Sequence, residues 1–304
     1  SDVCSSDLPH SRMSTTSESG AYNYDLHCHS TVSDGTLPPA ALVQRAQEKG
    51  VEVLALTDHD EVAGVAEATV AAQEAGIQLL AGVEVSVSWS KQTIHVVGLN
   101  VDPNNPELLA GLEKLREYRH WRGEEIGRKL EKVGIEGAYA GALEHRKGDL
   151  LTRTHYGRLL LERGLANDMQ GVFKKYLLRG KPGYVAGKWA TLEAAVGWIK
   201  AAGGVAVVAH PARYDMTRTK LRRLLHEFIE LGGVGLEVVS SSHNTNEIHT
   251  MAQHAVDLGL AASRGSDFHD PAYRWIELGR LPALPKKCEP IWTTGNKSLK
   301  LWHK

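Results

Sequence analysis

Histidine and acidic residues recur in short motifs along this sequence, and both types of side chain bind metal ions. The chain has 15 histidines among 304 residues, and histidine is the commonest protein ligand of transition metals. In the first motif, His27-Cys28-His29, the two imidazoles share one face of a strand because side chains alternate along it. Such a pair could bind a metal ion, although most pairs of this kind bind nothing specific.

Six further motifs each supply an imidazole or a carboxylate. They are Ser33-Asp34-Gly35, Thr57-Asp58-His59-Asp60, Gly82-Val83-Glu84, Ile94-His95-Val96-Val97-Gly98, Ala209-His210-Pro211 and Ser266-Asp267-Phe268-His269. Each alone has a plainer explanation: an aspartate before glycine suits a turn or helix cap, and a histidine in an apolar run can be a hydrogen-bonded core residue. Their joint placement, nearly always at the carboxyl end of an apolar strand, favours one shared site.

Together these motifs predict a cluster of metal ions. The nine candidate ligands are His27, His29, Asp34, His59, Glu84, His95, His210, Asp267 and His269. Imidazole and carboxylate ligands suit manganese, iron or zinc, and the lack of paired cysteines argues against a structural zinc site. Nine ligands exceed what one tetrahedral ion can use, so we expect two or three ions with Glu84 as a bridge. Adjacent ions of this kind promote in-line hydrolysis by activating water and stabilising charge on the attacked group.

Apolar strands and helices alternate on both sides of a central interruption. The expected strands are 24–29, 51–56, 77–83, 93–99, 204–209, 234–238 and 260–263, and the expected helices are 38–49, 61–75, 218–231 and 246–258. This alternation predicts a parallel sheet, open or closed into a barrel. Sheets of this type build their sites at the carboxyl ends of the strands.

Residues 101–185 interrupt that alternation. Leucine and isoleucine recur there at helical spacing, and no apolar β-branched run appears. We therefore predict a helical insertion between two barrel segments, residues 22–100 and 186–285. The insertion carries 16 basic and 12 acidic residues, a net charge of +4, in a chain with 35 basic and 36 acidic residues. This surplus indicates either a solvated helix face or a role in binding anions.

Other features of the composition set broader limits. The three cysteines, Cys4, Cys28 and Cys288, form no plausible disulfide framework and favour a reducing cytosol. No apolar run reaches the length of a membrane helix. We therefore expect a cytoplasmic protein without a membrane partner, whose oligomeric state is open, a monomer included. Residues 1–21 read as a disordered or non-native leader, and residues 286–304 as a C-terminal surface tail.

The ordered set of motifs resembles the PHP (polymerase and histidinol phosphatase) family over about residues 24–98 and 204–284. The resemblance implies a distorted (β/α)7 barrel of the PHP type, of the α/β class, with three divalent metal ions, usually manganese, with iron or zinc as alternatives. It implies a first metal held by His27, His29, Glu84 and Asp267, a second by Glu84, His95 and His210, and a third by Asp34, His59 and His269. Glu84, Asp267 and His269 are the candidate catalytic residues, since Asp267 or His269 could also pass a proton to the leaving oxygen.

Within the family, the size of the insertion is similar to the branch of 3′,5′-nucleotide bisphosphate phosphatases and 5′→3′ exoribonucleases. That similarity implies metal-activated attack of hydroxide on the phosphorus of a nucleotide bisphosphate or of the 5′ end of a short RNA. Arg153 and Arg213 would hold phosphate, because a planar guanidinium suits bidentate contact, and His155, Arg179 and Lys181 are further candidates.

Two other functions stay open at the level of sequence. A histidinol-phosphate phosphatase, or another small-molecule phosphatase of the family, would use the same metal ligands. A metal-binding regulatory module would keep the ligands without any need for oriented arginines. Two positions need a structure to interpret them: Arg264 precedes Gly265, where we expect a small residue, and His243 could line the site or lie behind it.

Overall fold

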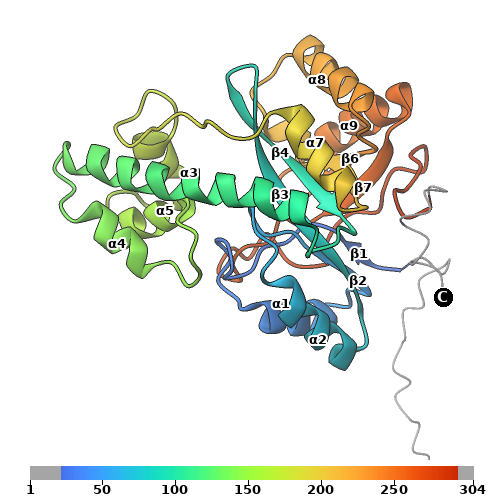
Figure 1. Ribbon diagram of the computed structural model, residues 1–304, viewed down its shortest axis with the longest axis horizontal. Helices are drawn as coiled ribbons and strands as arrows, with labels where there is room; N and C mark the ends of the chain where they lie inside the picture. Colours follow the sequence, from blue (N-terminus) through green and yellow to red (C-terminus); the bar gives the residue numbers. More distant parts are fainter. Residues whose placement is uncertain (1–21, 294–304) are drawn as a thin grey trace, which may run out of the picture.

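The computed structural model describes residues 22–293; the predicted leader, residues 1–21, and residues 294–304 of the predicted tail lie outside that range. Seven strands form one sheet in chain order (Figure 1). They are β1 (Tyr24–Asp25), β2 (Val53–Leu56), β3 (Gln78–Trp89), β4 (Gln92–Leu99), β5 (Val205–Val208), β6 (Gly235–Ser240) and β7 (Ala261–Gly265).

The two ends of the sheet meet just beyond β1 and β7. The backbone N–H of Leu26 donates to the carbonyl oxygen of Arg264 at 3.0 Å, and that of His29 donates to Phe268 at 2.9 Å. The sheet is therefore a nearly closed barrel, and the first and last motifs of the sequence lie side by side. The predicted fold class, a distorted seven-stranded α/β barrel, is confirmed.

The expectation of an all-parallel sheet is wrong for one strand. Strand β4 runs antiparallel to both β3 and β5, whereas the other neighbouring strands are parallel. Between β3 and β4 lie only Ser90 and Lys91, both with left-handed backbone, at φ 47° and 64°. A parallel crossover needs a dozen residues or more, so this short connection permits only a hairpin.

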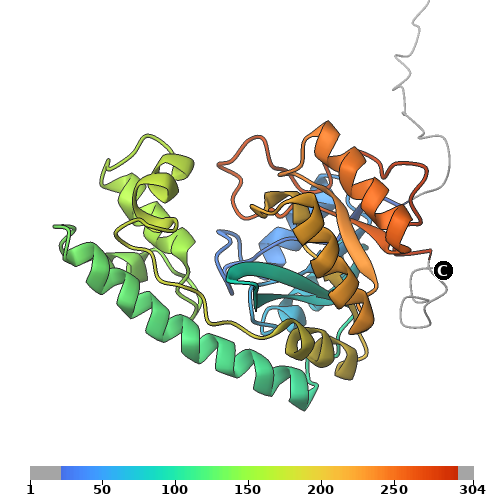
Figure 2. The same cartoon turned by 90° about the horizontal axis from the view of Figure 1, so that it is seen from above.

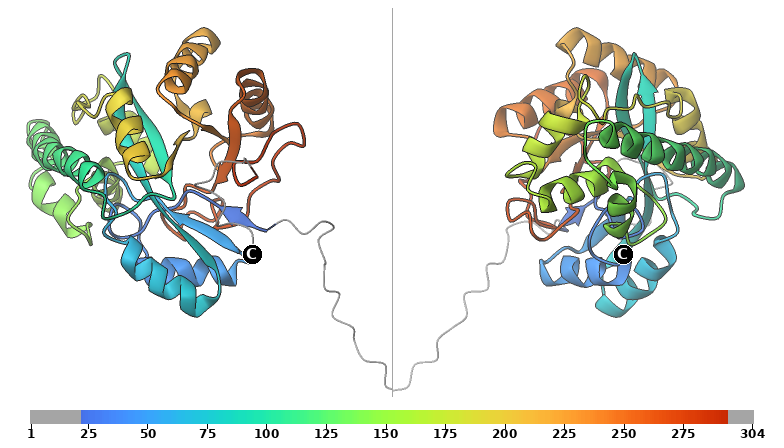
Figure 3. Two further views of the ribbon diagram at one scale, coloured as in Figure 1. Left: turned by 45° about the vertical axis from the view of Figure 1, so that its right-hand side comes forward. Right: turned by 90° about the vertical axis from the view of Figure 1, so that its left-hand side faces the viewer.

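Helices cover the outside of the barrel. Helices α1 (Pro39–Glu48) and α2 (Val65–Ala75) lie on one side, and α7 (Leu192–Ala201), α8 (Arg218–Glu230) and α9 (Thr245–Leu258) lie on another (Figures 1 and 3). The sequence reading did not assign α7. Among residues 22–293, no helix combines the length and the apolar character that crossing a membrane requires.

The chain between β4 and α7 contains helices alone among its regular elements. The long helix α3 (Pro106–Glu131) runs outward from the barrel, and α4 (Ala138–Glu144), α5 (Arg153–Glu162), α6 (Met169–Val172) and the π-helix η1 (Phe173–Leu177) gather near its far end (Figure 2). Buried apolar residues from these helices form a separate cluster that includes Ile126, Leu130 and Tyr156. The near end of α3 instead packs into the barrel's own core through Leu108 and Leu112.

Gly111 lies where α3 crosses α7, and it leaves no room for a larger side chain. A Cβ atom at this position would overlap the indole ring of Trp198. We expect Gly111→Val to lower the free energy of unfolding by about 1–3 kcal/mol, because the added methyl groups must displace the indole. Urea unfolding followed by circular dichroism measures the change.

Gly197, on α7, provides the matched control. A Cβ atom there would meet nothing within 4 Å, and alanine favours a helix over glycine by roughly 0.5–1 kcal/mol. Gly197→Ala should therefore keep or raise stability. A Gly111→Val protein as stable as the unsubstituted chain would contradict the close packing of α3 on α7.

Candidate metal centre

The nine predicted ligands converge at one end of the barrel, around the fully buried carboxylate of Glu84. Five histidines lie within 3.3 Å of its two oxygens. His95 Nδ1, His210 Nε2 and His27 Nε2 lie 2.8, 3.0 and 3.3 Å from Oε1, and His59 Nδ1 and His29 Nε2 lie 2.9 and 3.2 Å from Oε2. Glu84 thus occupies the central position expected of a bridging ligand.

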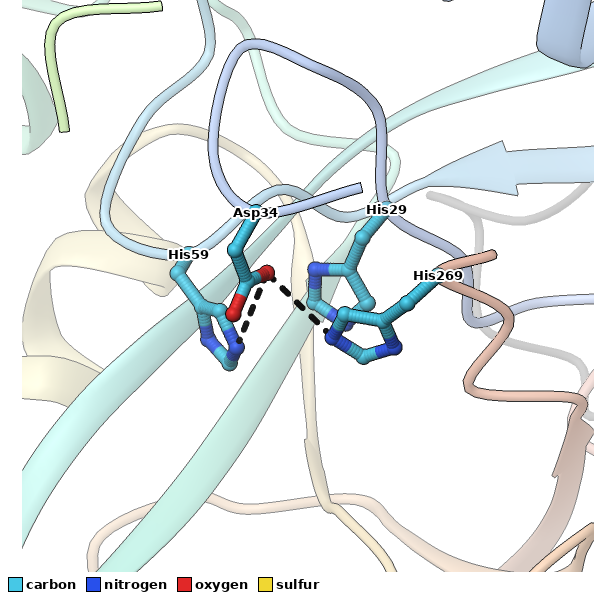
Figure 4. Close-up of side chains that lie close together, drawn as sticks. All are labelled: His29, Asp34, His59 and His269. Atoms are coloured by element: carbon cyan, nitrogen blue, oxygen red, sulfur yellow. Dashed lines mark ion pairs between the residues drawn. The ribbon is translucent and has the colours of Figure 1, made fainter. Parts of the chain in front are cut away.

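The two aspartates extend this cluster on either side. Asp267 Oδ1 lies 3.2 Å from His29 Nε2 and 3.5 Å from His27 Nε2. Asp34 Oδ1 lies 3.3 Å from His269 Nε2 and 3.7 Å from His59 Nε2. Figure 4 shows His59 and His269 on either side of the Asp34 carboxylate.

Three overlapping groups of side chains could each hold an ion, with ligand atoms all within 4.8 Å of one another. They are His27, His29, Glu84 and Asp267; His29, Asp34, His59 and His269; and His59, Glu84 and His95. The first group has the membership that the family resemblance implies. His29 additionally joins the group around Asp34, and His59 stands in place of His210 in the group with Glu84 and His95, so the ligands of each individual ion stay a prediction.

The cluster contains polar atoms that metal ions would satisfy. Within the described residues, Asp34 Oδ1, His59 Nδ1, Glu84 Oε2 and His95 Nδ1 lie among the ligand atoms and are buried without a hydrogen-bond partner. Buried polar atoms in proteins are ordinarily hydrogen bonded. Converging nitrogen and carboxylate oxygen atoms without such partners fit divalent cations of the manganese, iron or zinc type.

The electrostatics of the site keep the carboxylates ionised but do not keep every imidazole neutral. Burial alone would raise the pKa of Asp34, Glu84 and Asp267, but the surrounding histidines hold each pKa well below its usual value. Burial lowers the pKa of His210 to about 4, whereas the neighbouring carboxylates outweigh burial and raise the pKa of His29 to about 10 and that of His27 well above its usual value. Since imidazoles bind metal in their neutral form, His27 and His29 would release protons when a cation binds.

Hydrogen bonds behind the ligands fix their orientation. His27 Nδ1 lies 3.0 Å from Glu237 Oε1, and His269 Nδ1 lies 2.8 Å from the carbonyl oxygen of Asp267. Each Nδ1–H therefore donates outward and leaves Nε2 free to face a cation, an arrangement that orients histidine ligands in many metal sites. The sequence reading missed Glu237, although it is the one charged residue in β6.

The loop that carries Asp34 is anchored by a second residue that the sequence reading left without a role. The carboxylate of Asp58 accepts hydrogen bonds from Ser30 N at 2.8 Å and from Ser33 Oγ at 2.6 Å. From the insertion, Thr154 Oγ1 donates to Asp34 Oδ2 at 2.8 Å. Asp34 is therefore held from two directions, through its loop by Asp58 and directly by Thr154, and neither of these side chains is a predicted metal ligand.

His95 reaches the site by a different route from the one expected. Because β4 is antiparallel, His95 does not stand at the carboxyl end of a parallel strand. It pairs in register with Ser86 on β3, two residues beyond Glu84 and on the same face. The hairpin therefore brings His95 to the end of the barrel where the other ligands lie.

The predicted substrate-binding residues differ from one another in their exposure and in their contacts. Arg213 is half exposed, and its Nη1 lies 2.8 Å from Asp267 Oδ2. The guanidinium of Arg153 lies 5.6 Å from the ring centroid of Phe173. His155 is buried, and its Nδ1 accepts the N–H of Thr152 at 3.0 Å inside the first turn of α5, so its role toward substrate stays a prediction.

Four further positions that the sequence singles out lie outside the ligand cluster. Arg179 and Lys181 are exposed. Arg264 donates to the carbonyl oxygen of Leu281 at 3.1 Å and lies away from the ligand cluster. His243 lies behind the site, where its Nε2 accepts the N–H of Ala212 at 3.3 Å and supports the loop after His210.

Comparisons with known proteins agree with this geometry. The family model for the PHP domain matches residues 25–241. The 3′,5′-nucleoside bisphosphate phosphatase of Chromobacterium violaceum is 50% identical over 271 residues, which are 89% of this chain and 95% of that protein. The 5′-3′ exoribonuclease Rnm of Escherichia coli (strain K12) is 45% identical over 271 residues, covering 88% of this chain and 92% of that protein.

A solved structure is similar over almost the same extent. It is an amidohydrolase from Chromobacterium violaceum with bound sulfate and no metal, which is 48% identical, has a TM-score of 0.87, and covers 92% of this chain and 96% of its own. The family model spans well over half of the chain, and the relatives match it over most of their length. The chain therefore belongs to the PHP domain family, as the resemblance of its motifs implies.

Proposed function

We propose that the chain is a metal-dependent phosphoesterase that hydrolyses nucleotide 3′,5′-bisphosphates or removes nucleotides from the 5′ end of short RNA. The observation that carries this proposal is the convergence of eight ligand side chains on Glu84, together with Arg122 and Arg153, which pair with no carboxylate among residues 22–293. The names of the relatives in Chromobacterium violaceum and Escherichia coli support it, since one acts on nucleoside bisphosphates and the other on RNA.

The cofactors that we propose are three divalent ions, with manganese as first choice and iron or zinc as alternatives. The residues that would hold them are Glu84 and the eight other predicted ligands around it. When bound, such ions lower the pKa of a water molecule and stabilise negative charge on a phosphoryl group. Asp267 and His269 are both held in orientation, Asp267 by Arg213 and His269 by a backbone carbonyl, and both stay candidates for moving a proton to the leaving oxygen.

Two arginines of the insertion, Arg122 and Arg153, carry positive charge that no carboxylate in the described part of the chain neutralises. Arg122 is 7% exposed and donates through Nε and Nη2 to the carbonyl oxygen of Val185, at 3.2 and 2.9 Å, rather than to a carboxylate. Burial, together with Arg153 and Arg119, lowers its pKa to about 9. Burial likewise lowers the pKa of Arg153, with Arg119 and Arg213 adding to the effect.

A cation withdrawn from water without a counter-charge is costly, so a phosphate group is a natural partner for Arg122, which is buried, and for Arg153, which is partly buried. Arg213 pairs with Asp267 and is 51% exposed, which would let it contact the same substrate from the metal side. A substrate with one phosphate at the metal ions and a second at the arginines would satisfy both groups. This arrangement favours a bisphosphate or an oligonucleotide over histidinol phosphate, which has one phosphate, and over a binding module without a substrate.

The central carboxylate gives the first test of this function. Glu84→Gln keeps the size of the side chain but removes the charge that faces five histidines. We expect turnover in the presence of Mn²⁺ to fall about 100-fold or more, as for loss of a group that stabilises transition-state charge. Turnover is measured as phosphate release from adenosine 3′,5′-bisphosphate and histidinol phosphate, and as nucleotide release from a short 5′-phosphorylated RNA.

Glu74→Gln, at an exposed position on α2, is the control and should leave turnover unchanged. Full turnover by Glu84→Gln would exclude the proposed metal centre. Turnover of histidinol phosphate alone by the unsubstituted chain would favour the small-molecule phosphatase, and no turnover of any substrate with Mn²⁺, Fe²⁺ or Zn²⁺ would favour the regulatory module.

The second test concerns the arginines. Arg153→Lys keeps the charge but loses the planar pair of donors that phosphate prefers. We expect the KM for adenosine 3′,5′-bisphosphate to rise by roughly 10-fold or more, the scale of one lost charge-assisted hydrogen bond, with a much smaller change for a nucleoside monophosphate. Steady-state phosphate release with both substrates measures the difference.

Arg128 is exposed on α3 and pairs with Glu125, so Arg128→Lys serves as the control. An equal rise of KM for both substrates in Arg153→Lys would mean that Arg153 does not recognise the second phosphate.

A further inference from the structure

Three arginines of helix α3 stand three residues apart and lie on the same face of the helix. Arg116, Arg119 and Arg122 all contact the barrel or the segment that returns to it. Arg122 is proposed above to contact phosphate, whereas Arg119, in the middle of this row, binds the side chain of Asp60. Arg119 is only 6% exposed, so its contacts are made inside the protein.

Arg119 binds a buried carboxylate next to a predicted metal ligand. Its Nε donates to Asp60 Oδ2 at 2.7 Å, and its Nη2 donates to Ser86 Oγ at 2.8 Å. The other carboxylate oxygen of Asp60 accepts the N–H of Ser86 at 2.7 Å. Arg119, Asp60 and Ser86 thus form a closed triangle of hydrogen bonds behind the ligand cluster.

Two corners of this triangle, Asp60 and Ser86, adjoin a residue at the metal centre. Asp60 directly follows His59, and Ser86 lies two residues beyond Glu84 on the same face of β3. The backbone joins the same two segments, since Asp60 N donates to the carbonyl oxygen of Glu84 at 3.0 Å. Asp60 also has left-handed backbone, with φ at 50°, a conformation that an aspartate keeps only where its surroundings hold it.

A tryptophan stabilises Arg119 from its other side. The guanidinium carbons of Arg119 and Arg122 lie 4.8 and 5.2 Å from the ring centroid of Trp189, distances at which a cation and an aromatic ring attract each other. Trp189 Nε1 in turn donates to Thr93 Oγ1 at 3.1 Å on β4. The guanidinium of Arg119 is therefore fixed between the barrel's hairpin and the loop after β2.

We propose that Arg119 is a positioning residue of the metal centre, which acts through Asp60 and Ser86 to fix His59 and Glu84. The insertion then has two tasks, because α3 orients metal ligands through Arg119 and contacts substrate through Arg122 one turn further along. A lysine cannot replace Arg119 in this role, since it has no planar pair of donors for Asp60 and Ser86 together. This inference rests on the proposed metal centre and does not depend on which phosphate ester is the substrate.

The test uses the full chain, stripped of metal and titrated with Mn²⁺ in a calorimeter. For Arg119→Lys we expect the dissociation constant for Mn²⁺ to rise about 10- to 100-fold, the usual effect of losing a residue that orients a metal ligand. At saturating Mn²⁺, kcat should recover most of its value and KM for adenosine 3′,5′-bisphosphate should stay within about 2-fold of normal. Arg122→Lys, on the same helix and the same tryptophan, should show the reverse: a raised KM and unchanged Mn²⁺ affinity.

Asp60→Asn separates positioning from general loss of structure. Because Arg119 and Asp60 are proposed to act through one link, the double variant Arg119→Lys with Asp60→Asn should bind Mn²⁺ no more weakly than the weaker single variant. The proposal would be overturned if the losses of Mn²⁺ affinity in the two single variants multiplied in the double variant. It would also be overturned if the substitutions lowered the melting temperature of the metal-free protein and left the Mn²⁺ affinity unchanged. If the unsubstituted chain bound no Mn²⁺, the metal centre itself would fail; normal binding by both the unsubstituted chain and Arg119→Lys would sink only the role of Arg119.

Discussion

A single buried carboxylate organises this end of the barrel. Glu84 is fully buried, and five imidazole rings approach its two oxygens within 3.3 Å. Burying a charge costs a large free energy unless opposite charge surrounds it, so the site depends on cations or protonated rings at this position. The barrel, the hairpin of β3 and β4 and the closing contacts of β1 with β7 all serve to deliver side chains to that carboxylate.

The insertion is joined to this cluster at two places. Thr154 of α5 binds Asp34, and Arg119 of α3 binds Asp60 beside His59. These contacts place α3 and α5 against the ligand loops, and the same helices carry Arg122 and Arg153, which pair with no carboxylate among residues 22–293. The positive net charge that the sequence shows for residues 101–185 thus has at least two uses besides solvation: the ion pair with Asp60, and the proposed contact with phosphate.

Much of the ligand cluster could be predicted because most strands bring a histidine or an acid at or after an apolar run. The antiparallel course of β4 was missed because the apolar pattern of a strand carries no direction, although the short gap before Gln92 excludes a parallel crossover. Glu237 and Asp58 were missed because their role depends on partners more than twenty-five residues away in the chain, His27 and Ser30. Arg119 was missed because the sequence of a highly charged helix does not show which of its arginines point into the protein and which point into solvent.

The central claim is that the side chains around Glu84 hold divalent ions. Anomalous X-ray diffraction at the manganese absorption edge, from crystals grown with Mn²⁺, tests it most directly. The account predicts strong peaks within roughly 2.0–2.5 Å of nitrogen and carboxylate oxygen atoms of the nine ligands, a bonding distance for such ions, with Glu84 touching more than one peak. An empty cluster, or peaks found only at other acidic groups on the surface, would contradict it.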